Sequence, residues 1–304
     1  MTIDIRKTCP APHPRASACF SEPLFIFAGT VRRALGGENN DRINGQQQAA
    51  RVQIEYQIRD MELSDRKRCL DMMEGTFLRD EPLSQILDIQ SDLVSVSTIR
   101  SNWERYAEQG ICLACYTEED GVPRELVGCN ILVVKSADDE EGDIDNVSGE
   151  TWRKLLRTLV TAEGFVDVFE HYGVDRYLTS SGLAVVPPHR GQNIGAQIIN
   201  ARRYPKGGTM IRKPGSDDGI PEKTRAIIEC IREAICKAFG FDATATVFTA
   251  RSSQVLAAKC GYQQLAVLPY EDMLQHGIDL TGCATPSAVL MGRQYNVHPA
   301  PDAQ

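Results

Sequence analysis

The segment that most constrains the fold is a β-rich apolar run, Tyr177 to Val186, which stops at two consecutive prolines. Proline cannot donate to a sheet ladder, so the strand must end there. The loop Arg190-Gly-Gln-Asn-Ile-Gly-Ala196 follows, and residues 197–202 have a helical pattern. A strand that turns tightly into a helix directs several unpaired N–H groups and the positive end of the helix dipole at one point. Such a point suits a pyrophosphate, although a plain strand-to-helix connection fits the spacing equally well.

The composition indicates an ordinary globular protein with an acidic balance of charges. The chain has 304 residues, of which 42% are hydrophobic, and its 33 Lys and Arg against 41 Asp and Glu give a net charge of -8. This balance argues against a nucleic-acid partner, because neutralising phosphates needs a surplus of basic residues. The apolar runs are too short for a signal-peptide core or for crossing a bilayer. We therefore expect a cytoplasmic protein with no membrane partner.

Cysteines and histidines predict no metal site. The ten cysteines are too few for a disulfide-held miniature fold, and a cytosolic protein keeps them as thiols. The one close pair, Cys112 and Cys115, lies in a strand-like segment where residues three apart point to opposite faces. The two sulfurs therefore cannot share a metal without a turn between them. The five histidines lie far apart in the sequence. We expect core cysteines and no bound metal.

The rest of the chain alternates strand and helix patterns. Residues 1–50 contain several prolines and little hydrophobic periodicity, which indicates a disordered leader; a mitochondrial targeting segment is the alternative. Order is expected to begin with a strand over 52–58. Helices are predicted over 64–74, ending near Gly75, over 95–109 and over 151–163. A hairpin is predicted over 111–117 and 126–134, and the acidic stretch 138–145 is predicted to be a solvated loop. A further strand, 244–249, enters a helix that runs to a Gly261-Tyr262 corner.

This pairing of two strand-to-helix connections resembles the GNAT superfamily of N-acetyltransferases. In that family an Arg/Gln-x-x-Gly-x-Gly/Ala loop binds the pyrophosphate of acetyl-coenzyme A (acetyl-CoA). Arg190, Ile194 and Gly195 fit the pattern, whereas Asn193 stands where the family usually has glycine. Asparagine is the non-glycine residue most tolerant of left-handed backbone, so the turn can be kept. The resemblance implies that acetyl-CoA is held by Ala184, Val185, Val186, Arg190, Gly191, Gln192, Asn193, Ile194, Gly195 and Ala196.

Three further features resemble the insect arylalkylamine N-acetyltransferase branch. They are the segment Phe77–Leu83, which contains Asp-Glu-Pro-Leu, the segment Phe169–Gly173, and Ser253 at the start of the last helix. The similarity runs from about residue 52 to residue 294. In that branch the glutamate of the Asp-Glu-Pro-Leu stretch is the proposed general base, which implies this role for Glu81. Without the resemblance, Glu81 would be interpreted as a surface loop carboxylate.

The resemblance also implies two hydroxyl groups near the coenzyme sulfur. Ser253 maps onto a serine that the insect enzymes place there, and Thr249 lies where they often have a second serine. Capping of the last helix is the competing role for both hydroxyls. Many other acetyltransferases use a tyrosine four residues before the Gly-aromatic corner as general acid, but this chain has Ala257 there. His171 and Tyr262 are candidate substitutes, and both are better explained as packing residues.

Prolines and glycines interrupt the helix expected after the coenzyme loop. Removing residues 203–232 joins two helical pieces into one amphipathic helix, so we interpret this stretch as an insertion and, as a hypothesis, an unspliced intron read in frame. A genuine surface excursion with its own helix, over 221–239, is the alternative. The predicted organisation is a leader over 1–50, an acetyltransferase domain over 51–298 with an insertion at about 203–232, and a tail over 299–304.

The resulting prediction is an α/β (α+β) GNAT fold, with a central mixed, mostly antiparallel sheet splayed at the acetyl-CoA cleft and helices on both faces. The implied reaction is direct attack of the primary amine of an arylalkylamine, similar to dopamine, serotonin or octopamine, on the co-substrate acetyl-CoA. Phe77 and the Phe169–Tyr172 region are candidates for an aromatic wall. Polyamine, agmatine or longer-chain acyl substrates, and an acyl-CoA-binding homologue without turnover, are the alternatives. We expect a monomer that binds a small-molecule amine.

Overall fold

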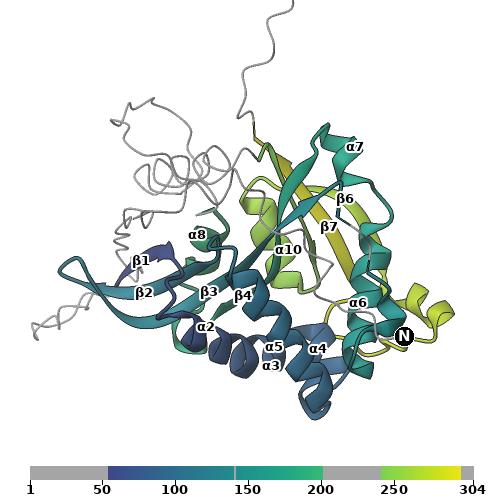
Figure 1. Cartoon of the computed structure of the whole chain (residues 1–304), viewed down its shortest axis with the longest axis horizontal. Helices are drawn as coiled ribbons and strands as arrows, with labels where there is room; N and C mark the ends of the chain where they lie inside the picture. The colour runs from purple at the N-terminus through teal and green to yellow at the C-terminus, as the bar shows by residue number, and fades with distance from the viewer. Residues whose placement is uncertain (1–53, 140–141, 201–240, 296–304) are drawn as a thin grey trace, which may run out of the picture.

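The computed structural model describes residues 54–139, 142–200 and 241–295, so the predicted leader, insertion and tail lie outside the described residues (Figure 1). Within these residues seven strands form one sheet in the order β1-β2-β3-β4-β5-β7-β6. All neighbouring pairs are antiparallel except β4 and β5, which confirms the predicted mixed, mostly antiparallel sheet. The strands are β1 (Glu55–Asp60), β2 (Leu113–Glu119), β3 (Val122–Ser136), β4 (Arg176–Val185), β5 (Ala243–Phe248), β6 (Gln263–Pro269) and β7 (Ser287–Gln294).

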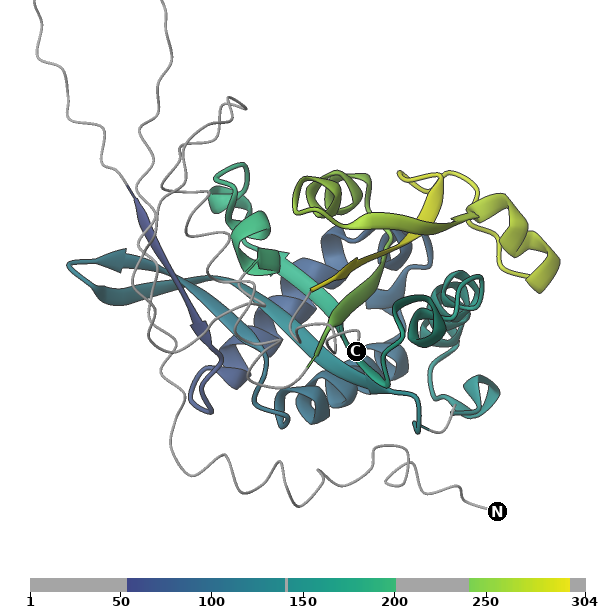
Figure 2. The same cartoon turned by 90° about the horizontal axis from the view of Figure 1, so that it is seen from above.

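Helices cover both faces of the sheet, as predicted (Figure 2). The helices from α2 to α6 lie on one face of the sheet, and α8 and α10 lie beside each other on the other face. None of the helices in the described residues has the length and apolar character needed to span a bilayer. The helices are α2 (Arg66–Met72), the π-helix η2 (Met73–Phe77), α3 (Leu78–Asp80), α4 (Pro82–Ile86), α5 (Leu93–Ala107), α6 (Glu150–Glu163), α7 (Val168–Tyr172), α8 (Ile194–Asn200) and α10 (Arg251–Lys259); the 3₁₀ turns are η3 (Ile89–Ser91), η4 (Ile144–Asn146), η5 (Pro187–His189) and η6 (Tyr270–His276).

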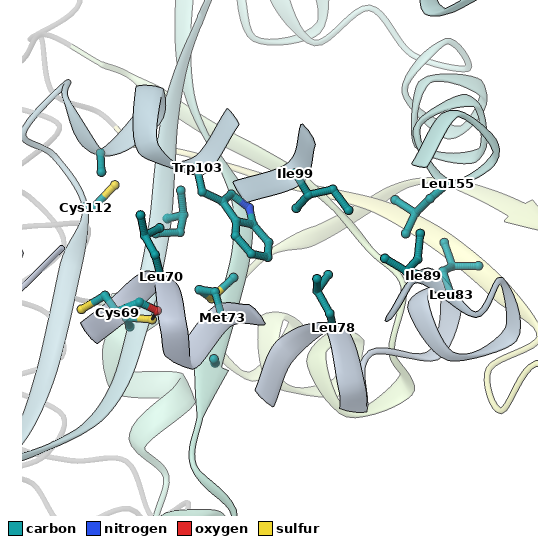
Figure 3. Packing of buried hydrophobic residues seen from close by; sticks show 14 of the residues in the cluster. Cys69, Leu70, Met73, Leu78, Leu83, Ile89, Ile99, Trp103, Cys112 and Leu155 are labelled. Atoms are coloured by element: carbon teal, nitrogen blue, oxygen red, sulfur yellow. Dashed lines mark hydrogen bonds between the residues drawn. The ribbon is translucent and has the colours of Figure 1, made fainter. Parts of the chain in front are cut away.

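The largest buried cluster lies between the sheet and the segment from α2 to α5. Figure 3 shows the Trp103 ring of α5 above Met73, with Leu78 and Leu83 further along the same layer. Leu83 is fully buried although it belongs to a helix of only five residues. Burial of such apolar side chains is what holds a short helix in place, because an isolated helix of this length is unstable in water. The core therefore fixes the backbone on both sides of residues 80 and 81.

Several strand predictions are confirmed with small shifts of their ends. The hairpin turns through Asp120 and Gly121, which both have a positive φ, as a tight two-residue turn requires. Cys112 and Cys115 belong to different buried clusters, which confirms that they face opposite sides of the sheet. The helix end predicted near Gly75 is wrong, because the chain continues as the π-helix and α3 to residue 80. A glycine inside a helix costs only about 1 kcal/mol, which burial of the neighbouring apolar side chains offsets.

Candidate active site

The candidate site lies where β4 and β5 separate. These parallel strands share one register pair, Leu178 with Thr244, and the Thr244 hydroxyl donates to the Leu178 carbonyl at 2.7 Å. The hydroxyl oxygens of Thr179 and Thr246 still lie 3.5 Å apart. Further along, the described parts of the two strands are not paired with each other. The predicted splay of the sheet is confirmed, and it opens toward the carboxyl ends of both strands.

Two adjacent carboxylates span the open end of this gap. Asp80 accepts a hydrogen bond from Arg190, which follows β4 and lies 110 residues away in the sequence. Glu81 accepts one from Thr249, which follows β5 and lies 168 residues away. The structure therefore brings together three of the predicted site residues, Glu81, Thr249 and Arg190. Asp80 completes the connection between the ends of the two strands.

Glu81 is a buried, fully hydrogen-bonded carboxylate. It is the N-cap of α4 and is 7% exposed, so the alternative of a surface loop carboxylate is wrong. Its Oε1 accepts hydrogen bonds from the Leu83 amide at 3.0 Å and the Thr249 hydroxyl at 2.7 Å. Its Oε2 accepts from the amide and the hydroxyl of Ser84, at 2.6 and 2.7 Å. A carboxylate has about four acceptor positions, and these four hydrogen bonds occupy them.

Neither predicted hydroxyl caps α10. The N-cap of this helix is Ala250, which has no side chain able to bond an amide. The Thr249 hydroxyl turns instead toward α4, where it donates to Glu81. The Ser253 hydroxyl donates to the Ala250 carbonyl at 2.8 Å, a contact that satisfies an acceptor rather than a free amide. Ser253 thus lies in the first turn of α10, and its hydroxyl is turned back on its own helix.

Sequence reasoning missed two residues beside this pair. Ser84 lies three positions after Glu81, and this spacing is the signal that could have revealed it as a donor to the capping carboxylate. Tyr270, buried in η6, donates to the Thr249 carbonyl at 3.3 Å. Burial raises the pKa of Tyr270, and the charge of Glu81 raises this pKa further, so the phenol stays protonated at neutral pH. No sequence pattern marks this tyrosine, because an aromatic residue after a strand is ordinary.

Arg190 has two contacts that orient its guanidinium group. Its Nε donates to the Val185 carbonyl at 2.8 Å, and its terminal nitrogen pairs with Asp80. Asp80 also accepts a hydrogen bond from Arg79 at 2.6 Å. Arg79, followed by Arg190, lowers the pKa of Asp80 to about 2. Because the Arg190 side chain is 44% exposed, its ion pair is screened by water, and another anion can replace Asp80 at small cost.

The loop between β4 and α8 has the tight backbone that its glycines predict. Gly191 has a φ of 75°, and Asn193 occupies the left-handed region with a φ of 64°. Nothing lies within 4 Å of where a Cβ on Gly191 would stand, so the backbone there is open to a ligand. The Gln197 amide donates to the Asn193 carbonyl, which starts the hydrogen bonding of α8. Amides 194–196 precede that ladder and are available as donors.

The side chains at the end of the loop point into the core, so the main chain of residues 194–196 is what can face a ligand. Ile194 and Ala196 are buried, and a Cβ on Gly195 would stand 3.0 Å from Leu256 of α10. Gln192 is half-buried. These positions therefore offer backbone groups rather than side-chain chemistry.

The last residues of β4 differ in the direction of their main-chain groups. Ala184 is buried and pairs with Cys129 of β3, and the Val186 amide donates to Val127 of the same strand at 2.9 Å. Because main-chain groups alternate along a strand, those of Val185 point away from β3 and toward the gap. Among the three predicted backbone contacts, Val185 is the best placed for a ligand between the strands.

A β-bulge interrupts β4 at the point where the gap begins. Ile131 of β3 pairs with Gly182 and the next β3 residue pairs with Ser180, which leaves Ser181 without a partner residue on β3. Gly182 has a φ of 150°, and a Cβ there would stand 2.5 Å from the Met73 side chain. The bulge therefore requires glycine at this position. Bulges are frequent next to active sites, where they redirect main-chain groups, and an isolated glycine inside a strand pattern is the signal that could have indicated this one.

The remaining candidates are packing residues or lie elsewhere. Tyr262 is buried with its ring edge-to-face against Phe248 at 5.8 Å, which confirms its packing role. His171 is exposed and contacts Tyr172 at 4.6 Å between ring centroids. Tyr172 and Phe169 pack in the buried cluster around α7, so an aromatic wall in that region is not supported. Within the described residues no group of His, Cys, Asp and Glu side chains is arranged to hold a metal ion.

Comparison with known proteins gives matches in structure alone. No protein-family profile matches the chain, and no curated protein sequence matches it. The solved structure of a putative arylalkylamine N-acetyltransferase 7 from the yellow fever mosquito Aedes aegypti is similar, with a TM-score of 0.67 and 21% identity over 90% of this chain and 98% of that chain. Arylalkylamine N-acetyltransferase 2 from Aedes aegypti has a TM-score of 0.61 and 13% identity over 79% and 99%.

A third similar structure is that of an enzyme for aliphatic amines. The polyamine N-acetyltransferase of Drosophila melanogaster, which catalyses formation of N-acetylagmatine, has a TM-score of 0.53 and 15% identity over 79% of this chain and 99% of that chain. These likenesses confirm the predicted fold and the structural resemblance to the arylalkylamine branch. They do not choose between aromatic and aliphatic amines, because proteins of one fold can act on different substrates.

Proposed function

We propose that this chain, which has the fold of the GNAT acetyltransferases, transfers an acetyl group from acetyl-CoA to the primary amine of an arylalkylamine. One observation carries the proposal: the buried Glu81 carboxylate is hydrogen-bonded to Thr249 at the open end of the β4–β5 gap. A carboxylate at that place lies beside any ligand held between the ends of the two strands. Ligands of open α/β sheets bind at the carboxyl ends of strands, where neighbouring connections diverge.

The loop over residues 190–196 is proposed to hold the diphosphate of acetyl-CoA. The left-handed backbone of Gly191 and Asn193 and the amides at the start of α8 support this assignment. Arg190 would contact a phosphate after leaving Asp80. The main chain of Val185 would contact the extended arm of the coenzyme. When bound, acetyl-CoA supplies the thioester carbonyl that the amine attacks.

Thr249 is proposed to carry the proton from the amine to Glu81. A primary arylalkylamine is an ammonium ion at neutral pH and must lose a proton before it can attack a carbonyl. The acceptor positions of Glu81 are occupied, so a direct contact with the amine would have to displace one of its donors. The Thr249 oxygen can accept the proton of the amine while its own proton passes to Glu81. The carboxylate then acts as general base through a hydroxyl group.

The remaining steps complete the transfer. The neutral amine forms a C–N bond to the acetyl carbon, and the C–S bond breaks with its electron pair on sulfur. The coenzyme thiolate then needs a proton, for which we propose Ser253, four residues after Thr249 and in the first turn of α10. The nitrogen that has attacked still carries two protons, and the one that it must lose to become an amide returns to the Ser253 oxygen. This role requires the Ser253 hydroxyl to leave the Ala250 carbonyl, to which it donates in the free protein. The proton that reaches Glu81 is released to solvent after each turnover.

An aromatic side chain beside the gap supports the arylalkylamine class. The Phe77 ring lies against the β4 bulge, because a Cβ on Gly182 would stand 3.2 Å from its Cζ atom. The same ring packs edge-to-face against Trp103, with 6.1 Å between centroids. A half-buried aromatic face at this position suits the ring of an aromatic amine better than an extended aliphatic cation. The substrate class therefore rests on Phe77.

The experiment that tests the function measures thiol release from acetyl-CoA with and without amine. The purified chain is incubated with tyramine, dopamine and serotonin in one series and with agmatine and putrescine in another. We expect amine-dependent thiol release, faster with the aromatic series. Turnover confined to the aliphatic series would contradict the substrate class, and coenzyme binding without any amine-dependent thiol would contradict the enzymatic role and leave an acyl-CoA-binding protein.

A further inference from the structure

The β4 bulge is held by side chains from both faces of the sheet. On the face covered by α5, the Trp103 indole donates to the Ser181 hydroxyl at 3.1 Å and to the Ser181 carbonyl at 3.3 Å. Trp103 is 2% exposed, and Figure 3 shows its ring fixed among the apolar side chains of the core. The indole N–H is therefore a rigid donor directed at the residue that has no partner on β3.

The second contact comes from β3. The Ser180 hydroxyl donates to the Asn130 side-chain oxygen at 2.6 Å, and it accepts a hydrogen bond from the Gly182 amide at 3.3 Å. Asn130 is completely buried, and its Nδ2 has no hydrogen-bond partner. An unsatisfied buried amide costs about 1–3 kcal/mol, so a leucine at this place in β3 would serve stability better. The asparagine is therefore explained by what its oxygen does for Ser180.

We propose that Trp103 and Asn130 are positioning residues that hold the bulge so that a main-chain amide of the bulge faces the carbonyl oxygen of the acyl group. This inference rests on the proposed function. The bulge lies where β4 and β5 stop pairing, so it borders the gap in which the thioester must lie. Donors fixed before the reaction stabilise the oxyanion best, and a small displacement of such donors lowers the rate more than the affinity.

The test compares the two tryptophans of the chain. Trp103→Phe keeps an aromatic ring against Phe77 and removes the N–H donor together with part of the ring volume. Trp152→Phe is the control for the loss of ring volume, because the Trp152 indole N–H is buried without a hydrogen-bond partner and its half-buried ring packs against the same cluster. Asn130→Leu removes the acceptor of Ser180 together with the unsatisfied amide. All three variants are made in the full chain.

For Trp103→Phe and Asn130→Leu we expect kcat to fall at least tenfold while the KM for acetyl-CoA changes less than twofold. Thermal unfolding of Asn130→Leu should occur at the wild-type temperature or above it, which a merely structural role would not give. Trp152→Phe should keep the wild-type kcat. Equal kcat values for Trp103→Phe and Trp152→Phe in an active protein would overturn the inference and leave the proposed function intact.

A second readout does not depend on turnover. Amide hydrogen exchange over residues 178–184 should be at least fivefold faster in Trp103→Phe and Asn130→Leu than in the wild type and in Trp152→Phe. Unchanged exchange in both variants would contradict the positioning role even if the wild type had no acetyltransferase activity. Absence of activity in the wild type with faster exchange in the variants would overturn the proposed function and show that the bulge is still held by these two residues.

Discussion

The Thr249 hydroxyl donates a 2.7 Å hydrogen bond to the Glu81 carboxylate, across 168 residues of sequence. This contact joins the end of β5 to the start of α4, and it fills the last acceptor position of a carboxylate that already caps its own helix. Glu81 therefore has two tasks, one in the structure of α4 and one at the proposed site. For variants of Glu81, both the stability of the protein and its activity must therefore be measured.

Glu81→Gln should lower kcat about 10²-fold or more, because the amide cannot accept a proton. The Kd for acetyl-CoA should stay within threefold of wild type, since the hydrogen bonds of Glu81 go to Leu83, Ser84 and Thr249 and not to the proposed diphosphate loop. Loss of a capping carboxylate should also cost about 1 kcal/mol of unfolding free energy. Steady-state kinetics, calorimetry and denaturant unfolding measure the three quantities. Glu119→Gln, at an exposed hairpin carboxylate, is the control, and an E81Q kcat equal to that of this control would remove Glu81 from the mechanism.

Thr249 can be tested by a pair of substitutions. Thr249→Val keeps the shape of the side chain but removes the hydroxyl that relays the proton, and kcat should fall about 10- to 100-fold. Thr249→Ser keeps the hydroxyl and should retain at least a third of the wild-type kcat. The pH profile of kcat/KM distinguishes a relay from a packing effect: activity of the valine variant should recover as pH rises and more amine is already neutral. A valine variant with the wild-type profile and rate would exclude the relay.

Asp80 competes with the proposed phosphate for Arg190. The pKa of Asp80 is lowered to about 2, so this carboxylate is ionised at any pH at which the enzyme would be assayed. Asp80→Asn should release the guanidinium group and lower the Kd for coenzyme A two- to fivefold, whereas Arg190→Ala should raise it at least fivefold. Titration calorimetry measures both values. Weaker coenzyme binding in Asp80→Asn would contradict this competition and show that the ion pair orients Arg190 toward the phosphate.

Asn193 holds a left-handed backbone where the resembling family has glycine. Asn193→Gly should therefore leave the coenzyme Kd and the unfolding temperature close to wild type. Asn193→Val places a β-branched side chain at a φ of 64°, which costs about 1–2 kcal/mol or more, and should raise the Kd about 5- to 30-fold. Asn193→Ala gives an intermediate value. A valine variant that binds coenzyme as well as wild type would mean that this turn does not contact the ligand.

Asp60 should make stability fall as the pH rises from about 4 to 7. Burial, and then the charge of Glu62, raise the pKa of Asp60 in the folded protein to about 7, whereas an aspartate in the unfolded chain has a pKa near 3.9. The folded state therefore holds the proton longer, and the unfolded state gains relative stability once its own carboxylate ionises. Asp60→Asn should remove this loss, with wild-type stability at pH 4 and a gain of at most about 4 kcal/mol at pH 8.

Denaturant unfolding at the two pH values measures this difference. The control is Asp138→Asn, at an exposed aspartate of the loop after β3. This variant should follow the wild type at both pH values. An Asp60→Asn gain that is the same at pH 4 as at pH 8 would contradict the assignment.

Much of the fold could be predicted because the strands from β1 to β5 have clear local patterns. The run that forms β4 ends at prolines, and the hairpin of β2 and β3 turns at an Asp-Gly pair with positive φ at both residues. Two strands, β6 and β7, were not predicted. β6 is half exposed with no regular alternation, and β7 carries a glycine at position 292 whose missing side chain is explained by Tyr172, because a Cβ there would stand 2.5 Å from the tyrosine hydroxyl. This glycine is required by a tertiary contact, which the neighbouring sequence does not reveal.

The site was predictable only in part for the same reason. Only the family resemblance predicts Glu81 and Thr249 as site residues. The sequence around either residue does not indicate that their side chains are in contact. Glutamate is an unusual N-cap, so the cap on α4 was hidden, although proline at the next position is a typical helix start. The bulge of β4 and its contacts with Trp103 and Asn130 depend on pairing between distant segments. The register between strands that are distant in the sequence cannot be predicted from a single sequence.

Where β4 and β5 separate, each strand has an edge that is not paired with the other strand, and the two edges face each other. Bare edges normally invite other chains to add a strand, which is a common route to aggregation. Here both strands lie inside the sheet, with β3 beside β4 and β7 beside β5, so neither is an outer edge. We expect an extended ligand with amide groups at the spacing of a peptide to pair with these strands where they no longer pair with each other.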